Sequence, residues 1–256
     1  MSRHDYFSTR IKNVSKASFT KRIIFSFLAF ALLTALAIFS WKWLNKQPTE
    51  QGALKPLRTT LETNEKIFKS TFSENKLSKT YTEKDAVKNV RVNGRIGMLD
   101  SIDVNAWRLQ VIRAAGDTLK LSMDDIKKLP KEDVIFDFKC IEGWDQVTHW
   151  AGVPLKTFMQ YYHLDAQMKM EYMGLETMDK KYYVGIDMPS VLQPQTILCY
   201  EMNGKPLPMN QGYPLRLIIP VKYGIKHLKQ LGTMYFSNQK PRDYWAERGY
   251  DYYAGL

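Results

Sequence analysis

One apolar run near the start of the chain constrains its fold more than any other feature. Ile23 to Trp41 covers 19 residues without Asp, Glu, Lys or Arg. A helix needs about 20 apolar residues to cross the hydrocarbon core of a bilayer. Trp41 and Trp43 suit a membrane–water interface, where amphipathic rings collect. We therefore predict a transmembrane helix at residues 23–43.

Basic residues on one side of this run predict its orientation. Residues 1–46 hold eight Lys or Arg against one Asp, and six of these bases precede Ile23. The positive-inside bias then predicts a cytoplasmic basic tail at residues 1–22. The rest of the chain is expected in the periplasm, held by a single-pass anchor in a bacterial inner membrane.

A cleaved secretory signal is the alternative to an anchor. The run is long for a signal core, and Trp41-Lys42-Trp43 is a poor cleavage site, since small residues are preferred there. Residues 18–22, with the sequence SFTKR, weakly resemble a twin-arginine export signal. Such a signal would suit a protein that is exported already folded around a cofactor. We expect an uncleaved anchor.

Charge and cysteine content argue against two classes of function. Much of the net charge of +11 lies in the first 46 residues, and the remainder is only mildly basic. No basic helix or aromatic-basic motif stands out, so we expect no nucleic-acid binding. The two cysteines, Cys140 and Cys199, are too few and too far apart to indicate a disulfide framework or a zinc site.

The texture of the sequence changes at about residue 90. Residues 44–89 are polar and predict a linker, with a short amphipathic helix at 60–72 whose apolar positions are Leu61, Ile67 and Phe68. Residues 90–256 predict one domain of short strands without a βαβ rhythm, which indicates an α+β or mostly β class. Helices are expected at 122–129, capped by Ser122, and at 153–162. Strands are expected at 107–112, 134–139, 169–173, 182–186, 196–202, 215–219 and 232–236.

Cys140 stands at the end of an expected strand and at the start of a Gly-Trp turn. A thiolate is both a nucleophile and a soft metal ligand. No local signature of a cysteine hydrolase surrounds it, although His149 and His163 follow. A lone cysteine at a strand end is most often a buried core thiol, and Cys199 fits that interpretation. The neighbourhood of Cys140 alone does not decide its role.

Four blocks of sequence, in order and at sensible spacing, resemble the sulfite oxidase fold of molybdopterin-dependent oxidoreductases. Each block is weak by itself, but together they cover roughly residues 90–256, the predicted catalytic domain. In motif the chain is most similar to the periplasmic methionine sulfoxide reductase catalytic subunits. The blocks are CIEGW at 140–144 with WAGVPL at 150–155, PQTIL at 194–198 with EMNGKPLP at 201–208, GYPLRLIIP at 212–220 with KYGIKHLK at 222–229, and YWAERGY at 244–250.

The resemblance implies a strand-rich α+β domain that holds a molybdenum–molybdopterin cofactor with one pterin. Cys140 would then be the thiolate ligand of the metal, which explains why one cysteine is enough. The implied cofactor contacts near the pterin phosphate and ring, where donors with positive charge are needed, are Arg91, Asn93, Arg216, Lys226, His227 and Lys229.

Most of these contacts have an alternative interpretation. Arg216 could be a surface charge on a strand, and Lys226 and Lys229 could lie on a solvated face. Asn93 could serve only the turn that Asn-Gly forms by itself.

Two positions depart from the family pattern. Gln193 and Gln211 stand where relatives carry histidine. Glutamine keeps a hydrogen-bonding amide but removes a titratable group. The cofactor can still be held, whereas a proton relay through these positions is in doubt.

The chemistry after Cys140 favours a neutral substrate. Sulfite-oxidising relatives surround their dianionic substrate with arginines, whereas this chain offers Glu142, in a Cys-x-Glu-x-Trp arrangement like that of the sulfoxide reductases. We expect reduction of a neutral sulfoxide or similar small-molecule oxide, with protons from Glu142, Tyr223 or Tyr253. Sulfite oxidation is the alternative reaction. The alternative to an enzyme is a membrane-anchored binding protein that has lost the cofactor.

One anchor helix cannot carry electrons, and no haem motif is present in the sequence. We therefore expect a membrane or soluble electron-transfer partner that is linked to haem or quinone. The immunoglobulin-like domain through which sulfite oxidases dimerise does not follow the last block, so a monomer is expected.

Overall fold

The computed structural model describes residues 16–72 and 77–256, which fall into two compact units. One unit contains helix α2 (Lys16–Asn45), and the other comprises Glu50–Ala53 and Leu57–Leu256. Residues 1–15 of the predicted tail and 73–76 of the predicted linker lie outside the described residues. Each unit is described by itself.

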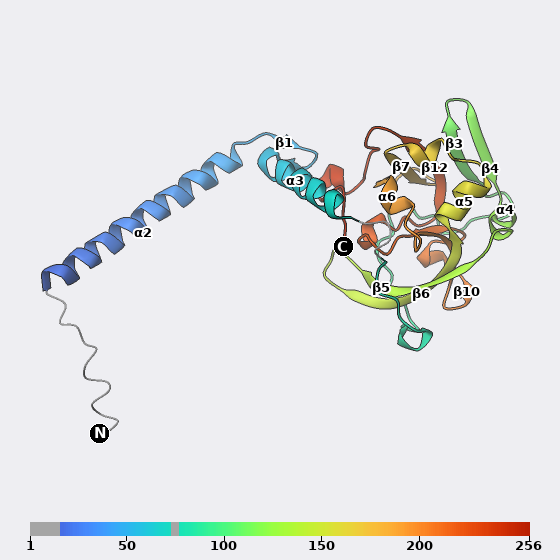
Figure 1. The fold of residues 1–256 in the computed structure, drawn as a ribbon, viewed down its shortest axis with the longest axis horizontal. Helices are drawn as coiled ribbons and strands as arrows, with labels where there is room; N and C mark the ends of the chain where they lie inside the picture. Colours follow the sequence, from blue (N-terminus) through green and yellow to red (C-terminus); the bar gives the residue numbers. More distant parts are fainter. Residues whose placement is uncertain (1–15, 73–76) are drawn as a thin grey trace, which may run out of the picture. The chain divides into compact units, whose positions relative to one another are not determined.

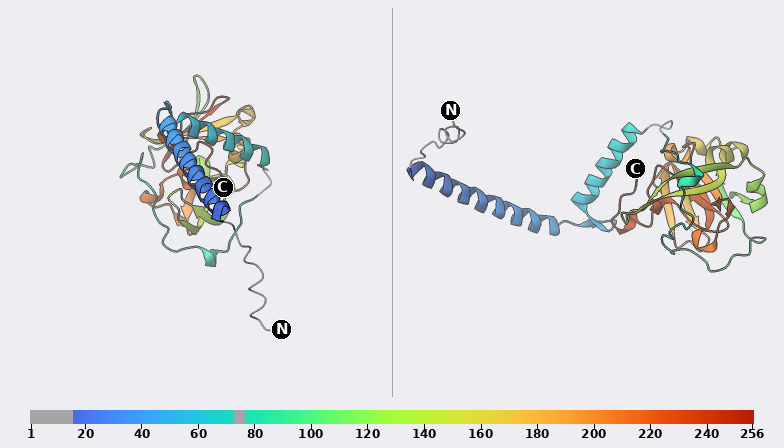
Figure 2. Two further views of the ribbon diagram at one scale, coloured as in Figure 1. Left: turned by 90° about the vertical axis from the view of Figure 1, so that its left-hand side faces the viewer. Right: turned by 90° about the horizontal axis from the view of Figure 1, so that it is seen from below.

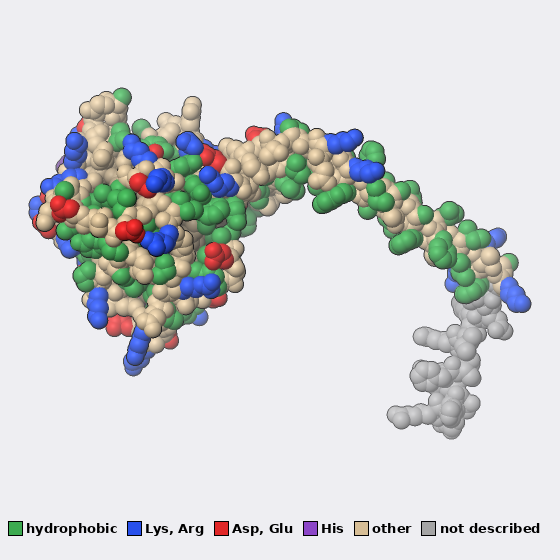
Figure 3. All heavy atoms as spheres, turned by 180° about the vertical axis from the view of Figure 1, so that it is seen from behind, with side chains coloured by type: hydrophobic (Ala, Val, Ile, Leu, Met, Phe, Trp, Pro, Cys, Tyr) green, Lys and Arg blue, Asp and Glu red, His purple; other side chains and the backbone are tan. Residues whose placement is uncertain are grey.

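Helix α2 contains the whole predicted transmembrane segment. It has 30 residues, an apolar window of mean hydropathy 2.5 and no buried side chain. Hydrophobic side chains cover the helix along its length (Figure 3). Within the described residues it is the one helix long and apolar enough to span a membrane. A secretory signal near the N-terminus can have the same length and apolar composition.

The first sheet of the larger unit is antiparallel and carries Cys140. Its strand order is β10-β9-β6-β5, and β11 also pairs with β9. The hairpin of β5 and β6 is the longest pairing and runs from Glu132 opposite Gly152 to Lys139 opposite Asp145 (Figure 1). The strands are β5 (Glu132–Lys139), β6 (Asp145–Pro154), β9 (Ile197–Met202), β10 (Lys205–Pro206) and β11 (Arg216–Ile218).

The second sheet is mixed, with strand order β4-β3-β12-β7-β8. Its central strand β12 runs parallel to β3 and antiparallel to β7. The strands are β3 (Leu109–Ala114), β4 (Asp117–Leu121), β7 (Tyr172–Thr177), β8 (Tyr183–Asp187) and β12 (Leu231–Ser237).

Short helices and turns connect these strands. The α-helices are α3 (Lys55–Thr71), α4 (Met123–Lys127), α5 (Leu155–Tyr161) and α6 (Met188–Val191), and two-residue strands β1 (Thr49–Glu50) and β2 (Ala53–Leu54) precede α3. The 3-10 turns are η1 (Glu83–Asp85), η2 (Gln167–Lys169), η3 (Met209–Gln211), η4 (Gly224–Lys226) and η5 (Ala246–Arg248). Ser122 caps α4 as predicted, because its side chain accepts from the Asp125 N–H and Asp125 accepts from the Ser122 N–H.

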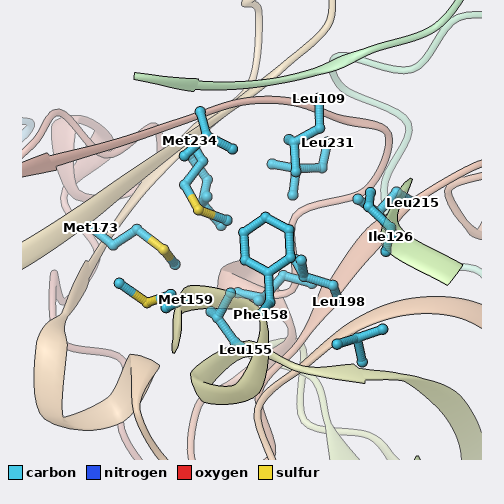
Figure 4. Close-up of a cluster of buried hydrophobic side chains, with 14 of the residues drawn as sticks. Leu109, Ile126, Leu155, Phe158, Met159, Met173, Leu198, Leu215, Leu231 and Met234 are labelled. Atoms are coloured by element: carbon cyan, nitrogen blue, oxygen red, sulfur yellow. The ribbon is translucent and has the colours of Figure 1, made fainter. Parts of the chain in front are cut away.

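The main hydrophobic core lies between the two sheets and α5. Leu155, Phe158 and Met159 of α5 point toward Met173 and Met234 of the second sheet, with Leu198 of the first sheet beside them (Figure 4). A smaller cluster on the first sheet includes Cys199, which is fully buried. Burial raises the pKa of the Cys199 thiol to about 12. The prediction of a core cysteine is confirmed there.

Most predicted strands are confirmed within two residues at each end. β7 starts at Tyr172 because residues 167–169 form a 3-10 turn instead. Strand β6 was not predicted from the sequence. Its side chains are buried without interruption from Thr148 to Pro154. A strand that is covered on both faces shows no period-two alternation.

Helix α3 exists as predicted, and it starts five residues earlier, at Lys55. Its two buried side chains are charged, Arg58 and Glu65. Ile67 is 56% exposed, and Phe68, which is 49% exposed, stacks on the Tyr253 ring. Ion pairs and hydrogen bonds dock this helix beside the C-terminal segment (Figure 2).

Candidate functional site

Cys140 lies in the tight turn that joins β5 to β6. The Cys140 N–H donates to the Trp144 carbonyl at 2.9 Å, and the Gly143 N–H donates to the Cys140 carbonyl at 3.0 Å. Gly143 has φ +87°, a left-handed conformation that a residue with a side chain rarely adopts. The turn therefore holds the cysteine at the strand end and puts Glu142 at its exposed tip.

The sulfur of Cys140 faces a cavity rather than bulk water. The residue is 5% exposed, and it lines a partly open cavity of about 120 Å³. Burial raises the pKa of the thiol, while the backbone N–H groups of Glu142 and Ile141 and the charge of Arg91 favour the thiolate. Backbone N–H groups that point at the sulfur stabilise the thiolate form, and a bound metal cation would neutralise the rest of its negative charge.

The opposite wall of the cavity comes from segments far apart in sequence. Asn93 and Gly94 precede β3, and Gly224 and His227 belong to η4 and its C-terminal cap. A Cβ on Gly224 would approach the Phe138 ring within 2.8 Å and the Asn93 amide nitrogen within 3.2 Å. The close approach of these three segments requires a residue without a side chain at this position.

The buried bases of the late sequence block divide into two sets. Lys222 forms an ion pair with Asp187 at 2.7 Å, and Lys226 forms one with Asp243 at 2.5 Å. Lys226 also donates to the Gly185 carbonyl at 2.8 Å and does not line the cavity. These two lysines are neutralised inside the fold.

Arg216 and Lys229 form the other set, because no carboxylate among the described residues faces them. Lys229 is 7% exposed, lines the cavity and donates to the carbonyls of Asn93 at 2.5 Å and Asn210 at 3.1 Å. Burial, together with the charge of Arg216, lowers the pKa of Lys229 to about 7.

Arg216 is fully buried just behind Lys229. Its guanidinium stands 4.5 Å from the Trp150 ring, and its Nε has no hydrogen-bond partner within the described part of the chain. Burial lowers the pKa of Arg216 to about 10. The alternative interpretation of Arg216 as a surface charge, and of Lys226 and Lys229 as a solvated face, is therefore wrong.

His227 is buried and neutral. Its Nε2 donates to the Lys222 carbonyl at 3.1 Å, and its Nδ1 accepts from the Ile219 N–H at 3.4 Å. Burial, reinforced by the charge of Arg216, lowers the pKa of His227 to about 3. Its ring also stacks on Phe136 at 6.0 Å between ring centroids. Such an imidazole contributes shape to the cavity but no proton near neutral pH.

The remaining predicted residues lie at different distances from the cavity. Glu142 lines it and accepts from the Trp144 indole at 2.9 Å. Arg91 is exposed, with its guanidinium 4.7 Å from the Trp144 ring. Tyr223 lies outside the cavity lining, and its N–H donates to the Ala254 carbonyl. Tyr253 is remote from the site, over the ammonium of Lys222 and in another cavity.

Sequence reasoning missed an aromatic part of the cavity wall. Tyr182, Trp245 and Tyr250 line it together with Ile96 and Met98. The hydroxyl of Tyr182 donates to the Ile225 carbonyl at 2.5 Å, and burial raises its pKa. Trp245 and Tyr250 belong to the last family block, which could have signalled them, whereas Tyr182 had no local signature.

The Gln211 amide uses both of its hydrogen-bonding functions. Its Oε1 accepts from Arg216 at 3.1 Å, and its Nε2 donates to the Val90 carbonyl at 3.2 Å. The side chain thereby connects the buried guanidinium to the segment before Arg91. Gln193 is buried, and its Oε1 accepts from the Gln195 N–H at 3.4 Å.

Comparison with known proteins identifies the family. The sequence model of the oxidoreductase molybdopterin-binding domain matches residues 96–245. The chain belongs to this family. It is a molybdopterin-domain oxidoreductase enzyme with a mixed α+β, strand-rich fold of sulfite oxidase type, as predicted.

Two curated relatives of this chain carry methionine sulfoxide reductase names. The chain is 32% identical over 186 residues to a protein of Azospira oryzae that is provisionally named protein-methionine-sulfoxide reductase subunit YedZ1, covering 72% of this chain and 70% of that one. It is 28% identical to the protein-methionine-sulfoxide reductase catalytic subunit MsrP of Campylobacter jejuni, covering 63% of this chain and 60% of the relative.

A solved structure also matches this family member. The sulfane dehydrogenase SoxCD of Paracoccus pantotrophus superimposes with a TM-score of 0.49 and 17% identity, covering 55% of this chain and 40% of that chain.

The residues present fit the anionic molybdenum–molybdopterin cofactor that the family implies. The cavity contains one sulfur with backbone donors aimed at it. Lys229 lines the same cavity, and the charge of the buried Arg216 acts on it; neither base has a carboxylate partner among the described residues. Two such charges close together are unfavourable by themselves and favourable beside a phosphate.

Proposed function

We propose that this molybdopterin-domain enzyme is an oxygen-atom transferase that reduces a neutral sulfoxide or a similar oxide. One observation carries the proposal: Glu142 lines the cavity beside Cys140, and no arginine occurs among the described residues that line it. A carboxylate at this place repels the sulfite dianion, whereas a neutral oxide tolerates it. The names of the two relatives support a sulfoxide.

The residues then divide the work of holding the cofactor. Cys140 is the proposed metal ligand, and Lys229, backed by Arg216 and Gln211, is the proposed cation for the pterin phosphate. Asn93 and His227 shape the wall between them. When bound, the cofactor supplies two-electron oxygen-atom transfer at its metal.

Reduction of a sulfoxide consumes two electrons and two protons and releases a thioether and water. Glu142 is the proposed source of protons, since its carboxyl group lines the cavity at an exposed position and can exchange protons with solvent. The Trp144 indole holds this carboxylate by a hydrogen bond, which orients it at the tip of the turn. Tyr223 and Tyr253 lie outside the cavity lining and are not needed for this role.

We also propose a place for the reaction. We infer a single-pass inner-membrane protein whose catalytic domain lies in the periplasm, and the apolar length of α2 supports this. Electrons then come from a membrane or soluble partner linked to haem or quinone.

Sulfite oxidation is the second candidate reaction, favoured by the charge of Arg91, which acts on the Cys140 sulfur.

Turnover and metal content test this function directly. Purified protein is assayed with methionine sulfoxide and with sulfite, using an artificial electron donor or acceptor, and its molybdenum is quantified. We expect turnover of the sulfoxide and stoichiometric molybdenum that disappears in Cys140→Ser, because the thiolate ligand is lost. Cys199→Ala is the matched control and keeps the metal, since Cys199 is a core residue. Activity on sulfite alone would refute the proposal.

A further inference from the structure

The turn at residues 245–250 forms part of the cavity wall. Trp245 and Tyr250 both line the Cys140 cavity, and their ring centroids are 5.0 Å apart. Between them the backbone makes η5 and then a left-handed Gly249 with φ +93°. This turn is short and contains a glycine, so its position depends on the contacts around it.

Arg58 of α3 makes the most direct contact with this turn. The side chain is 3% exposed, and its guanidinium donates to the carbonyls of Ala246 at 2.7 Å and Tyr250 at 3.0 Å. A third hydrogen bond, at 2.7 Å, goes to the Gln51 carbonyl. One buried cation therefore joins three backbone carbonyls from two segments that are nearly 200 residues apart.

Gly52 makes a second and independent contact with the same turn. It has φ +75°, and a Cβ at this position would lie 2.7 Å from the backbone of Arg248 and of Gly249. The backbones touch directly, so no larger residue fits. The turn is thus held from one side by Gly52 and from inside by Arg58.

Helix α3 has a separate attachment two turns further on. Glu65 forms ion pairs with Lys240 at 2.6 Å and with Lys69 at 2.9 Å. This attachment keeps α3 docked without touching residues 245–250. The roles of Arg58 and Glu65 can therefore be separated by experiment.

We propose that Gln51, Gly52 and Arg58 form a clamp that positions Trp245 and Tyr250 at the mouth of the Cys140 cavity. The clamp begins a few residues after the apolar helix α2 ends at Asn45, so the segment that follows α2 contacts the turn that supplies Trp245 and Tyr250 to the cavity wall. Arg58 is a positioning residue that acts through the two aromatic side chains. The proposal rests on the proposed function in assigning substrate contact to this wall.

Substitution of Arg58 in the full-length holoenzyme tests the clamp. In Arg58→Ala the Ala246 and Tyr250 carbonyls lose their donor, so amide exchange speeds up in residues 246–250 and not in β5 or β9. The KM for the sulfoxide rises roughly tenfold while kcat stays within about twofold, because the wall binds substrate and transition state alike. In Arg58→Lys the KM returns part of the way to the wild-type value. The molybdenum content of both variants equals that of the wild type.

Two control variants on the same helix separate positioning from docking. Lys66→Ala alters an exposed side chain and leaves exchange and KM unchanged. Glu65→Gln weakens the attachment of α3 but leaves exchange in residues 246–250 slow. Unchanged amide exchange and KM in Arg58→Ala would overturn the clamp. Faster amide exchange throughout the domain, with equal losses in kcat and kcat/KM, would also overturn it. If the wild type reduces no sulfoxide, the exchange result still decides the clamp, while the proposed function alone fails.

Discussion

The two sets of buried bases in residues 216–229 differ in what neutralises them. Lys222 and Lys226 each form an ion pair with a buried aspartate from a distant segment. Arg216 and Lys229 rest on carbonyl groups, and no acid among the described residues faces them. One basic block therefore contains two lysines that are paired inside the fold and two bases without an acidic partner among the described residues.

Loss of a paired base is expected to have the largest effect. In Lys226→Met the carboxylate of Asp243 stays buried without its partner, which lowers the free energy of unfolding by about 3–5 kcal/mol. Chemical denaturation of the cofactor-free protein measures this change.

Two further variants bracket that result. The double variant Lys226→Met with Asp243→Asn should recover much of the loss, because no uncompensated charge is left. Lys120→Met, at an exposed position in β4, should change stability little. A small change in the free energy of unfolding in Lys226→Met alone would contradict the difference between paired and unpaired bases.

Loss of an unpaired base is expected to affect the cofactor more than the fold. In Arg216→Met no carboxylate is left without a partner, so the free energy of unfolding of the cofactor-free protein changes much less than in Lys226→Met. Cofactor binding should weaken by roughly 10- to 100-fold, the value of a charged hydrogen bond of about 1.5–3 kcal/mol. Retention of molybdenum and pterin during dialysis measures this, with Arg216→Lys as the charge-preserving control. Equal retention in Arg216→Met and the wild type would contradict the role.

The pH dependence of Lys229 gives the smallest expected effect. Its pKa is about 7 in the folded protein, against about 10.5 when unfolded, so above pH 7 the unfolded state binds the proton and the folded state does not. Stability of the cofactor-free protein should therefore rise with pH above 7, by at most about 1.4 kcal/mol per pH unit. Below pH 7 both states bind the proton and this contribution is flat.

Thermal or chemical unfolding between pH 6 and 9 checks the slope. Lys229→Met should lack this part of the rise, since the titrating group is gone. A bound anionic cofactor should flatten the wild-type curve, because its charge favours the ammonium. Identical slopes in Lys229→Met and the wild type would show that folding does not lower the pKa of Lys229 in the cofactor-free protein.

Local patterns made much of the fold predictable. The strands with a regular alternation or a clear boundary, such as β9 and β12, were confirmed within two residues. Strand β6 was missed because its buried stretch has no alternation. The packing of α3 could not be predicted from the sequence, because its buried side chains are those of Arg58 and Glu65, which a hydrophobic pattern cannot reveal.

The candidate site was predictable where it lies on one continuous motif. Cys140 and Glu142 belong to the same turn, and the turn brings both to the cavity. Tyr182 could not be predicted, because it lies between β7 and β8 without a local signature, and its hydroxyl reaches the Ile225 carbonyl, 43 residues further along the chain. Tyr223 was expected at the site as a proton donor, yet it lies outside the cavity lining, and its N–H donates to the Ala254 carbonyl.

By itself the sequence determined the apolar helix, the strand-rich class and the family, since each depends on residues that are near neighbours in the chain. Only the tertiary structure decided which bases remain without an acid. Lys222 meets Asp187 across 35 positions and Lys226 meets Asp243 across 17, whereas Arg216 and Lys229 meet none among the described residues. Neutralisation of a buried charge depends on distance in space, and sequence separation carries no record of that distance.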